Sequence, residues 1–164
     1  MIKFFIQAGL SLMALGLVFF LGRTYLASED QQQSDIKEKE SMKPVPSIGP
    51  QEVVELQIKA MQQNDVPYDD HGIEVAYRFA SPANKENTGP LENFTQMVNN
   101  EVYSSLLNAR QYGLDAVEVE DDIAVQKVTL IDSEDKPVVY YFQLSLQEEG
   151  PYEDCWLTDS VVRY

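Results

Sequence analysis

An uncharged apolar run near the start of the chain constrains its architecture more than any other feature. Residues 4–21 read FFIQAGLSLMALGLVFFL, in which Gln7 and Ser11 are the only polar side chains. As a helix this run would span about 27 Å, close to the roughly 30 Å hydrocarbon core of a bilayer. It is long for a signal peptide, and Tyr25 stands where a cleavage site needs a small residue. We therefore expect an uncleaved single-pass transmembrane anchor over residues 1–27, with a cleaved signal peptide or a buried helix as the alternative.

The charges on either side of this run bear on its orientation. Lys3 and the terminal amine favour a cytoplasmic N-terminus. Arg23, Lys37 and Lys39 on the far side oppose that orientation, although acidic residues are interspersed among them. Because the N-terminal tail is so short, we expect a cytoplasmic N-terminus, with the soluble domain on the outer, periplasmic or lumenal, side of the membrane.

A polar segment separates the run from the rest of the chain. Residues 28–50 contain a triple Gln, mixed charges, Pro44 and Pro46, and no aromatic side chain. Such a segment cannot bury enough apolar surface to offset the loss of chain entropy on folding, so we expect a disordered linker. The remaining residues, 51–164, are an ordinary length for one domain.

The acidity of the chain belongs to this C-terminal domain. The net charge is −15, and residues 51–164 carry all of it, with seven basic and 22 acidic side chains. Phosphates would be repelled by such a surface, so nucleic acid is excluded as a partner and a basic protein surface is favoured. The single cysteine excludes an internal disulfide framework and any cysteine-rich metal site.

Hydrophobic periodicity divides the domain into helices followed by strands. A 3.6-residue period predicts a long helix over residues 51–64, shorter helices over 73–80 and from Gly89-Pro90 onward, and a helical turn over 101–109. Residues 81–84 are expected to form a turn. A two-residue period then predicts strands over residues 114–118, 123–131, 138–147 and 156–164.

The order of these elements predicts the fold class. The short connections imply antiparallel pairing, and only the helices can cover the buried face of the sheet. We expect an α+β domain in which the N-terminal helices pack on a curved antiparallel four-stranded sheet.

One stretch is distinctive enough to suggest a family. Residues 72–84 read GIEVAYRFASPAN, and Thr88-Gly89-Pro90 follows shortly after. Together with the helix before it and the acidic, Gly-containing turn that precedes Trp156, this stretch resembles an uncharacterised family of bacteria and photosynthetic organisms. That family is placed in the nuclear transport factor 2-like (cystatin-like) superfamily. The resemblance covers about residues 51–164. It implies a cone-shaped fold and no particular activity, because the superfamily includes isomerases, cyclases, dehydratases and many binding or assembly domains.

No residue pattern indicates a catalytic centre. His71 is the single histidine and lies in a polar run with Asp69 and Asp70, where a solvated loop is the simpler interpretation than a catalytic or metal-binding one. Tyr140 and Asp159 could form a hydroxyl–carboxylate pair, or could be a core tyrosine and an exposed acid. Cys155 is expected to be a small buried hydrophobe rather than a reactive thiol. We therefore expect no catalytic residues, no metal and no cofactor.

Two groups of residues remain as candidate sites. The first is a polar surface around the predicted turn, formed by Arg78, Ser81, Asn84, Asn87 and Thr88. These residues could equally have a structural role, in which their side chains cap the turn. The second is a pocket between the helices and the concave sheet, lined by Tyr140, Phe142 and Trp156.

Three functions fit these expectations. The first is a non-enzymatic, membrane-tethered domain that interacts with a protein partner or helps to assemble a complex, with a homodimer as one form of it. The second is binding of a small apolar ligand in the pocket. The third is an isomerase- or cyclase-like enzyme, which would need a carboxylate or His71 facing the pocket.

Overall fold

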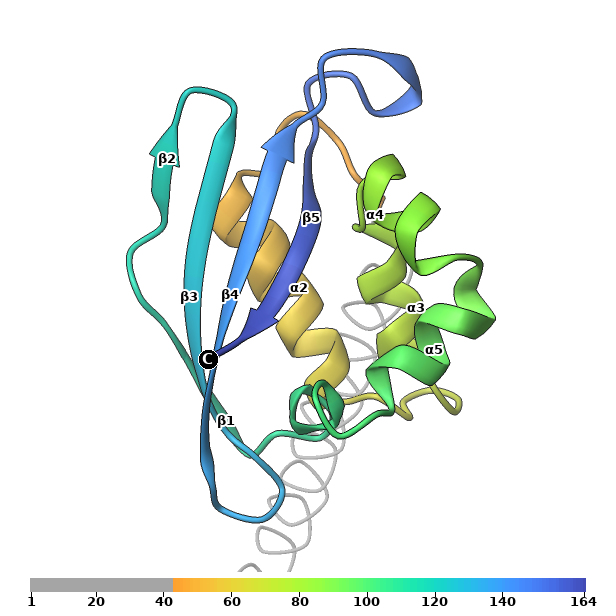
Figure 1. Cartoon of the computed structure of the whole chain (residues 1–164), viewed down its shortest axis with the longest axis vertical. Helices are drawn as coiled ribbons and strands as arrows, with labels where there is room; N and C mark the ends of the chain where they lie inside the picture. Colours follow the sequence, from red (N-terminus) through yellow and green to blue (C-terminus); the bar gives the residue numbers. More distant parts are fainter. Residues whose placement is uncertain (1–42) are drawn as a thin grey trace, which may run out of the picture. The chain divides into compact units, whose positions relative to one another are not determined.

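The computed structural model of the chain describes residues 43–164, which form a mixed helical and antiparallel domain. The predicted α+β class is thereby confirmed. Four helices precede five strands, with short 3₁₀ turns at Ser104–Leu106 and Gly150–Tyr152 (Figure 1). The elements are α2 (Pro50–Gln62), α3 (His71–Arg78), α4 (Pro82–Thr88), α5 (Leu91–Val98), β1 (Gln111–Leu114), β2 (Glu118–Glu120), β3 (Ile123–Ile131), β4 (Pro137–Leu146) and β5 (Trp156–Arg163).

The predicted membrane anchor lies outside the described residues. Within residues 43–164, no helix combines the length and the apolar character needed to cross a bilayer. The linker expected over residues 28–50 extends too far, because Ile48 is buried in the core of the domain and α2 begins at Pro50.

The sheet is antiparallel, and its strands run in the order β1-β3-β4-β5. β2 also pairs with β3, opposite Ile123 to Val125, while β1 pairs with the other end of β3. The predicted single strand over residues 114–118 is therefore wrong, since two short strands share this edge. The break between them coincides with buried Gln126, whose side-chain amide donates to the Asp115 backbone carbonyl.

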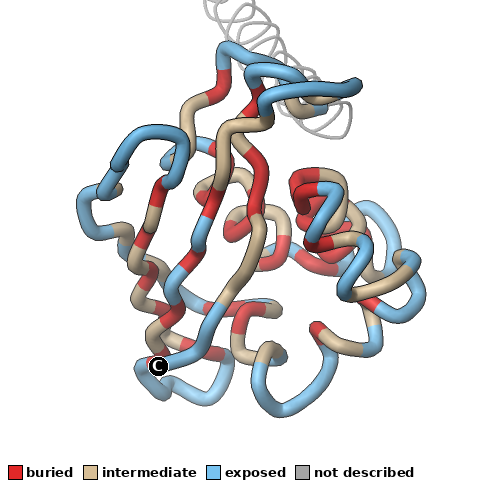
Figure 2. The backbone as a smooth tube through the Cα atoms, turned by 45° about the horizontal axis from the view of Figure 1, so that its top comes forward, coloured by how far each residue is buried: buried red, intermediate tan, exposed pale blue. Residues whose placement is uncertain are grey.

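The central strands show the alternation that the sequence predicts. In β4, Val138, Tyr140, Phe142 and Leu144 are buried, while Tyr141 and Gln143 are exposed. β3 alternates in the same way, so one face of the sheet meets the core (Figure 2). α2 lies across that face and contributes its own buried residues, Val53, Val54, Gln57, Ile58 and Met61.

A close approach of backbones joins α2 to α3. A Cβ on Gly72 would lie 2.3 Å from the Ala60 carbonyl oxygen and 2.9 Å from the Asn64 Cα. The Gly72 N–H donates to the Asn64 carbonyl at 2.9 Å, and the Asn64 Oδ1 accepts from the Ile73 N–H at 3.2 Å. The absence of a side chain at Gly72 therefore allows α3 to start directly against the end of α2.

The region after α3 differs from the prediction. The expected turn over residues 81–84 is the start of α4, because Ser81 Oγ caps the helix by accepting from the Asn84 N–H at 3.1 Å. Gly89, expected to begin the next helix, instead ends α4 with a positive φ of 80°, and Pro90 is the N-cap of α5. The helical turn expected over residues 101–109 shortens to one 3₁₀ turn.

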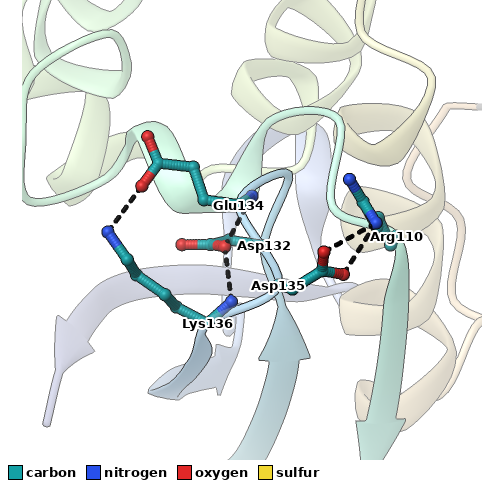
Figure 3. Close-up of polar contacts among 5 residues, drawn as sticks. All are labelled: Arg110, Asp132, Glu134, Asp135 and Lys136. Atoms are coloured by element: carbon teal, nitrogen blue, oxygen red, sulfur yellow. Dashed lines mark hydrogen bonds and ion pairs between the residues drawn. The ribbon is translucent and has the colours of Figure 1, made fainter.

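A tight turn joins the two longest strands, β3 and β4. The Asp132 Oδ1 accepts from the backbone N–H groups of Glu134 and Lys136, each at 2.9 Å (Figure 3). Asp135 takes a left-handed φ of 67°, and its carboxylate pairs with Arg110 at 2.7 and 2.8 Å. Since Arg110 directly precedes β1, this ion pair ties the edge strand to the β3–β4 turn.

Candidate functional site

A cavity of about 250 Å³ lies between the helices and the β4–β5 part of the sheet. Residues from α2, α3, α4, α5, β4 and β5 line it. Much of its wall is apolar or aromatic, and includes Met61, Phe94, Met97, Tyr103 and Phe142. A concave, mostly apolar cavity with a few polar groups is the usual form of a small-molecule site.

A chain of buried hydrogen bonds forms one polar wall of this cavity. The Gln57 Nε2 donates to the Ala76 carbonyl at 3.0 Å, and the Gln57 Oε1 accepts from the Thr158 hydroxyl at 2.7 Å. The Asn84 Nδ2 then donates to the Thr158 carbonyl at 3.0 Å. Gln57, Asn84 and Thr158 are all buried, so the network fixes α2, α3, α4 and β5 relative to one another.

The outer edge of β5 is held at the same point. The Thr158 N–H donates to the Phe79 carbonyl, and the Thr158 carbonyl accepts from the Ser81 N–H, both at 2.9 Å. These bonds form an isolated parallel bridge between Ala80 and Thr158. The segment that joins α3 to α4 is thus anchored to the sheet beside the cavity.

A β-bulge shapes the part of β5 that faces the cavity. Gln143 pairs with Ser160 and Leu144 pairs with Thr158, which leaves Asp159 as an extra residue in β5. Thr158, Asp159, Ser160 and Val161 are all among the residues that line the cavity. Bulges occur often beside functional sites.

The candidate surface from the sequence divides into two parts. Asn84, Asn87 and Thr88 line the cavity, the last of them with its hydroxyl donating to the Asn84 carbonyl at 2.9 Å. Arg78 and Ser81 do not line it. Arg78 forms an ion pair with Glu74 at 3.4 Å, and Ser81 caps α4, so both have structural roles.

The candidate pocket divides as well, since Phe142 lines the cavity but Tyr140 and Trp156 do not. Tyr140 is fully buried, and its hydroxyl donates to the Val102 carbonyl at 2.7 Å. Burial raises the pKa of the Tyr140 hydroxyl. Trp156 is half-buried against the core. Because Asp159 lines the cavity and Tyr140 does not, the two do not form the hydroxyl–carboxylate pair considered from the sequence.

The remaining residues considered for a chemical role are His71 and Cys155, and both are buried. His71 is buried at the start of α3, not solvated as expected, and its ring packs edge-on against Tyr68 at 4.8 Å between centroids. Among residues 43–164, no three or more His, Cys, Asp or Glu side chains are grouped as a metal site would require. Cys155 is buried as expected, and burial raises the pKa of its thiol, which disfavours the reactive thiolate.

Sequence reasoning missed Gln57, Thr158 and the cavity role of Asp159. Gln57 did carry a signal, because it occupies a position within the apolar stripe formed by Val54, Ile58 and Met61. A polar residue at such a position is buried and needs a partner. The bulge at Asp159 had no equivalent signal in the sequence. The alternation within β5 is compatible with more than one register against β4, so it does not show where an extra residue lies.

The chain belongs to a family defined by a domain of unknown function (DUF4864), whose model matches residues 48–162. The match covers almost all of the domain that the structure describes. Comparisons with curated proteins and with solved structures give no match.

Proposed function

We propose that this domain binds a small, largely apolar ligand in the cavity between α2–α5 and β5. The observation that carries the proposal is the cavity itself, which is walled by aromatic side chains and methionines and braced by the Gln57–Thr158–Asn84 hydrogen bonds. Its volume of about 250 Å³ is just below the usual range for ligand pockets, which starts at about 300 Å³, so the ligand is no larger than one ring with a short side chain. Preformed walls reduce the ordering cost of binding.

A membrane-tethered setting accompanies this role in the proposal. The uncharged run over residues 4–21 would anchor the chain, with residues 28–42 as a tether and the domain on the outer side of the membrane. We also infer that the domain has the cone of the nuclear transport factor 2-like superfamily. Helices that precede an antiparallel sheet, with a cavity enclosed between them, support this assignment.

Filling the cavity tests the proposal. The probe is 3-phenyl-1-propanol, a neutral molecule with one ring, added to the detergent-solubilised full-length protein. Ala76 lines the cavity, so Ala76→Leu places three further carbons there and is expected to weaken probe binding at least tenfold. The measurement is a calorimetric titration, with the melting temperature and circular dichroism as checks on folding.

The matched control is Ala83→Leu, an exposed position on α4 that does not line the cavity. It should bind the probe as the unmodified protein does. Equal affinity in the unmodified protein and a folded Ala76→Leu variant would place probe binding elsewhere and contradict the proposal.

A second candidate function is protein interaction or assembly through the outer face of the sheet. Tyr141 and Val162, which are paired across β4 and β5, are 37% and 58% exposed, and the Tyr164 ring packs edge-on against Tyr141 at 6.2 Å. Exposed apolar side chains that adjoin one another often mark an interface. The partner would be a second copy of the chain or a protein with a basic surface.

Purification of the tagged full-length protein from its own gently solubilised membranes tests this second function. A stoichiometric partner, or a homodimer, that is lost on Tyr141→Glu would support it. The matched control is Gln143→Glu, two residues along on the same face of β4 and also exposed. A monomer without any partner, before and after the substitution, would exclude the sheet face as an interface.

A further inference from the structure

One acidic residue lines the cavity, and its carboxylate is not used by the described fold. Asp159 lines the cavity at the bulge of β5 and is half-buried. Within the part of the chain that the structure describes, its carboxylate has no hydrogen-bond or ion-pair partner. The neighbouring Thr158, by contrast, is bonded through its N–H, its carbonyl and its hydroxyl. Asp159 therefore has its full accepting capacity available to a ligand.

The rest of the lining gives this carboxylate no positive partner. None of the described residues that line the cavity is Lys, Arg or His. The nearest cations along α3 and α4 are engaged elsewhere. Arg78 pairs with Glu74, and the Lys85 Nζ donates to the Arg78 carbonyl while lying 5.3 Å from the ring centres of Tyr77 and Tyr152. With one acidic residue and no basic residue in its described lining, the cavity favours a positively charged ligand over a negatively charged one.

Aromatic and polarisable side chains make up much of the remaining wall. Phe94, Tyr103 and Phe142 are its aromatic lining residues, and Met61 and Met97 are its methionines. The faces of aromatic rings attract cations, and most strongly where water is excluded. An ammonium group could therefore bind between the Asp159 carboxylate and the rings, while an apolar body fills the rest of the space.

We propose that the cavity is selective for an organic cation, an amine with a small apolar body, and that Asp159 is the residue that recognises its positive charge. This inference rests on the proposed ligand-binding function and names the class of ligand. Asn84, Asn87 and Thr88 line the polar side of the cavity and can accept or donate further hydrogen bonds to such a ligand. Anionic ligands are excluded by the same features, because their charge would be desolvated beside Asp159 without a positive partner.

Three probes with the same apolar body test the selectivity. They are 3-phenylpropylamine, 3-phenyl-1-propanol and 3-phenylpropanoate, which at neutral pH are a cation, a neutral molecule and an anion. Each is titrated against the full-length protein in detergent and against the Asp159→Asn variant. We expect the unmodified protein to bind the amine at least tenfold more tightly than the alcohol, and not to bind the carboxylate measurably.

Asp159→Asn keeps the shape of the side chain and removes its charge. The affinity for the amine should fall to that for the alcohol, while the affinity for the alcohol stays within about twofold. The control is Asp154→Asn, an exposed acid in the turn before β5 that does not line the cavity, which should leave all three affinities unchanged.

The outcomes separate this inference from the function on which it rests. If the alcohol binds and the amine has no advantage, or keeps its advantage in Asp159→Asn, the selectivity is overturned while ligand binding stands. If the alcohol and the amine both fail to bind the unmodified protein, ligand binding in the cavity is overturned and the selectivity with it.

Discussion

Gly72→Ala is expected to lower the free energy of unfolding by about 3 kcal/mol, because the added methyl group has no room. The new Cβ would lie 2.3 Å from the Ala60 carbonyl oxygen, 2.7 Å from the Ala60 carbonyl carbon and 2.9 Å from the Asn64 Cα. All three are backbone atoms, so no flexible side chain can move aside. α2 and α3 must separate, and the hydrogen bond from the Gly72 N–H to the Asn64 carbonyl must lengthen.

The measurement is equilibrium denaturation followed through Trp156, the single tryptophan of the chain. Gly113→Ala in β1 is the control, because a Cβ there would meet no atom within 4 Å. Its stability should stay unchanged or rise by up to about 1 kcal/mol, since alanine restricts the unfolded chain more than glycine does. Equal stabilities for the two variants would show that α2 and α3 do not approach as closely as described.

Gln57→Leu is expected to lower the free energy of unfolding by about 3 kcal/mol although it makes the core more apolar. In a regular helix the Ala76 carbonyl would accept from the Ala80 N–H. Here the Ala80 N–H donates to the Tyr77 carbonyl, and the Gln57 side-chain amide is the partner of the Ala76 carbonyl at the end of α3. The substitution leaves that carbonyl and the Thr158 hydroxyl without their partners in a buried setting. Gln51→Leu, at an exposed position of the same helix, should change stability by less than about 0.5 kcal/mol.

The double variant Gln57→Leu, Thr158→Val separates the cost of unpaired groups from a simple loss of contacts. Valine removes the hydroxyl that Gln57→Leu leaves unpaired, so the double variant should be no less stable than Gln57→Leu alone. Additive losses from the two substitutions would contradict the hydrogen bond between these side chains, because coupled residues depart from additivity.

Strong periodic patterns made the longest helix and the longest strands of this domain predictable. The alternation of Val138, Tyr140, Phe142 and Leu144 specifies a strand with one buried face, and the structure has it within one residue of the predicted ends. α2 was found for the same reason, since its apolar residues recur at helical spacing. These patterns report the direction of burial, which is a local property of the sequence.

The elements that were missed depend on contacts distant in sequence. α4 is short and polar, and it is held by the Asn84 amide on the Thr158 carbonyl, 74 positions away. The edge strand divides where Gln126 reaches the Asp115 carbonyl, which no period of the edge sequence encodes. Such contacts form only when the sheet and helices are already in place.

The candidate site was likewise predicted only in part. Polar residues near the α3–α4 connection were singled out by composition, and three of them, Asn84, Asn87 and Thr88, line the cavity. Phe142 was found because inward positions of β4 face the helices. Asp159 is the extra residue of a bulge in β5. A bulge depends on the register between two strands, so neither strand sequence alone predicts it.

The central claim is that the cavity admits a small ligand, and the methionine methyl groups report on it most directly. The chain has five methionines, of which Met61 and Met97 line the cavity and Met1, Met13 and Met42 belong to the N-terminal segment. We would label all five with ¹³C, record methyl spectra of the full-length protein in lipid nanodiscs, and titrate 3-phenyl-1-propanol. The account predicts saturable shifts of the Met61 and Met97 signals, with Met42 unchanged. Met61 and Met97 signals that keep their positions to the highest probe concentration would contradict it.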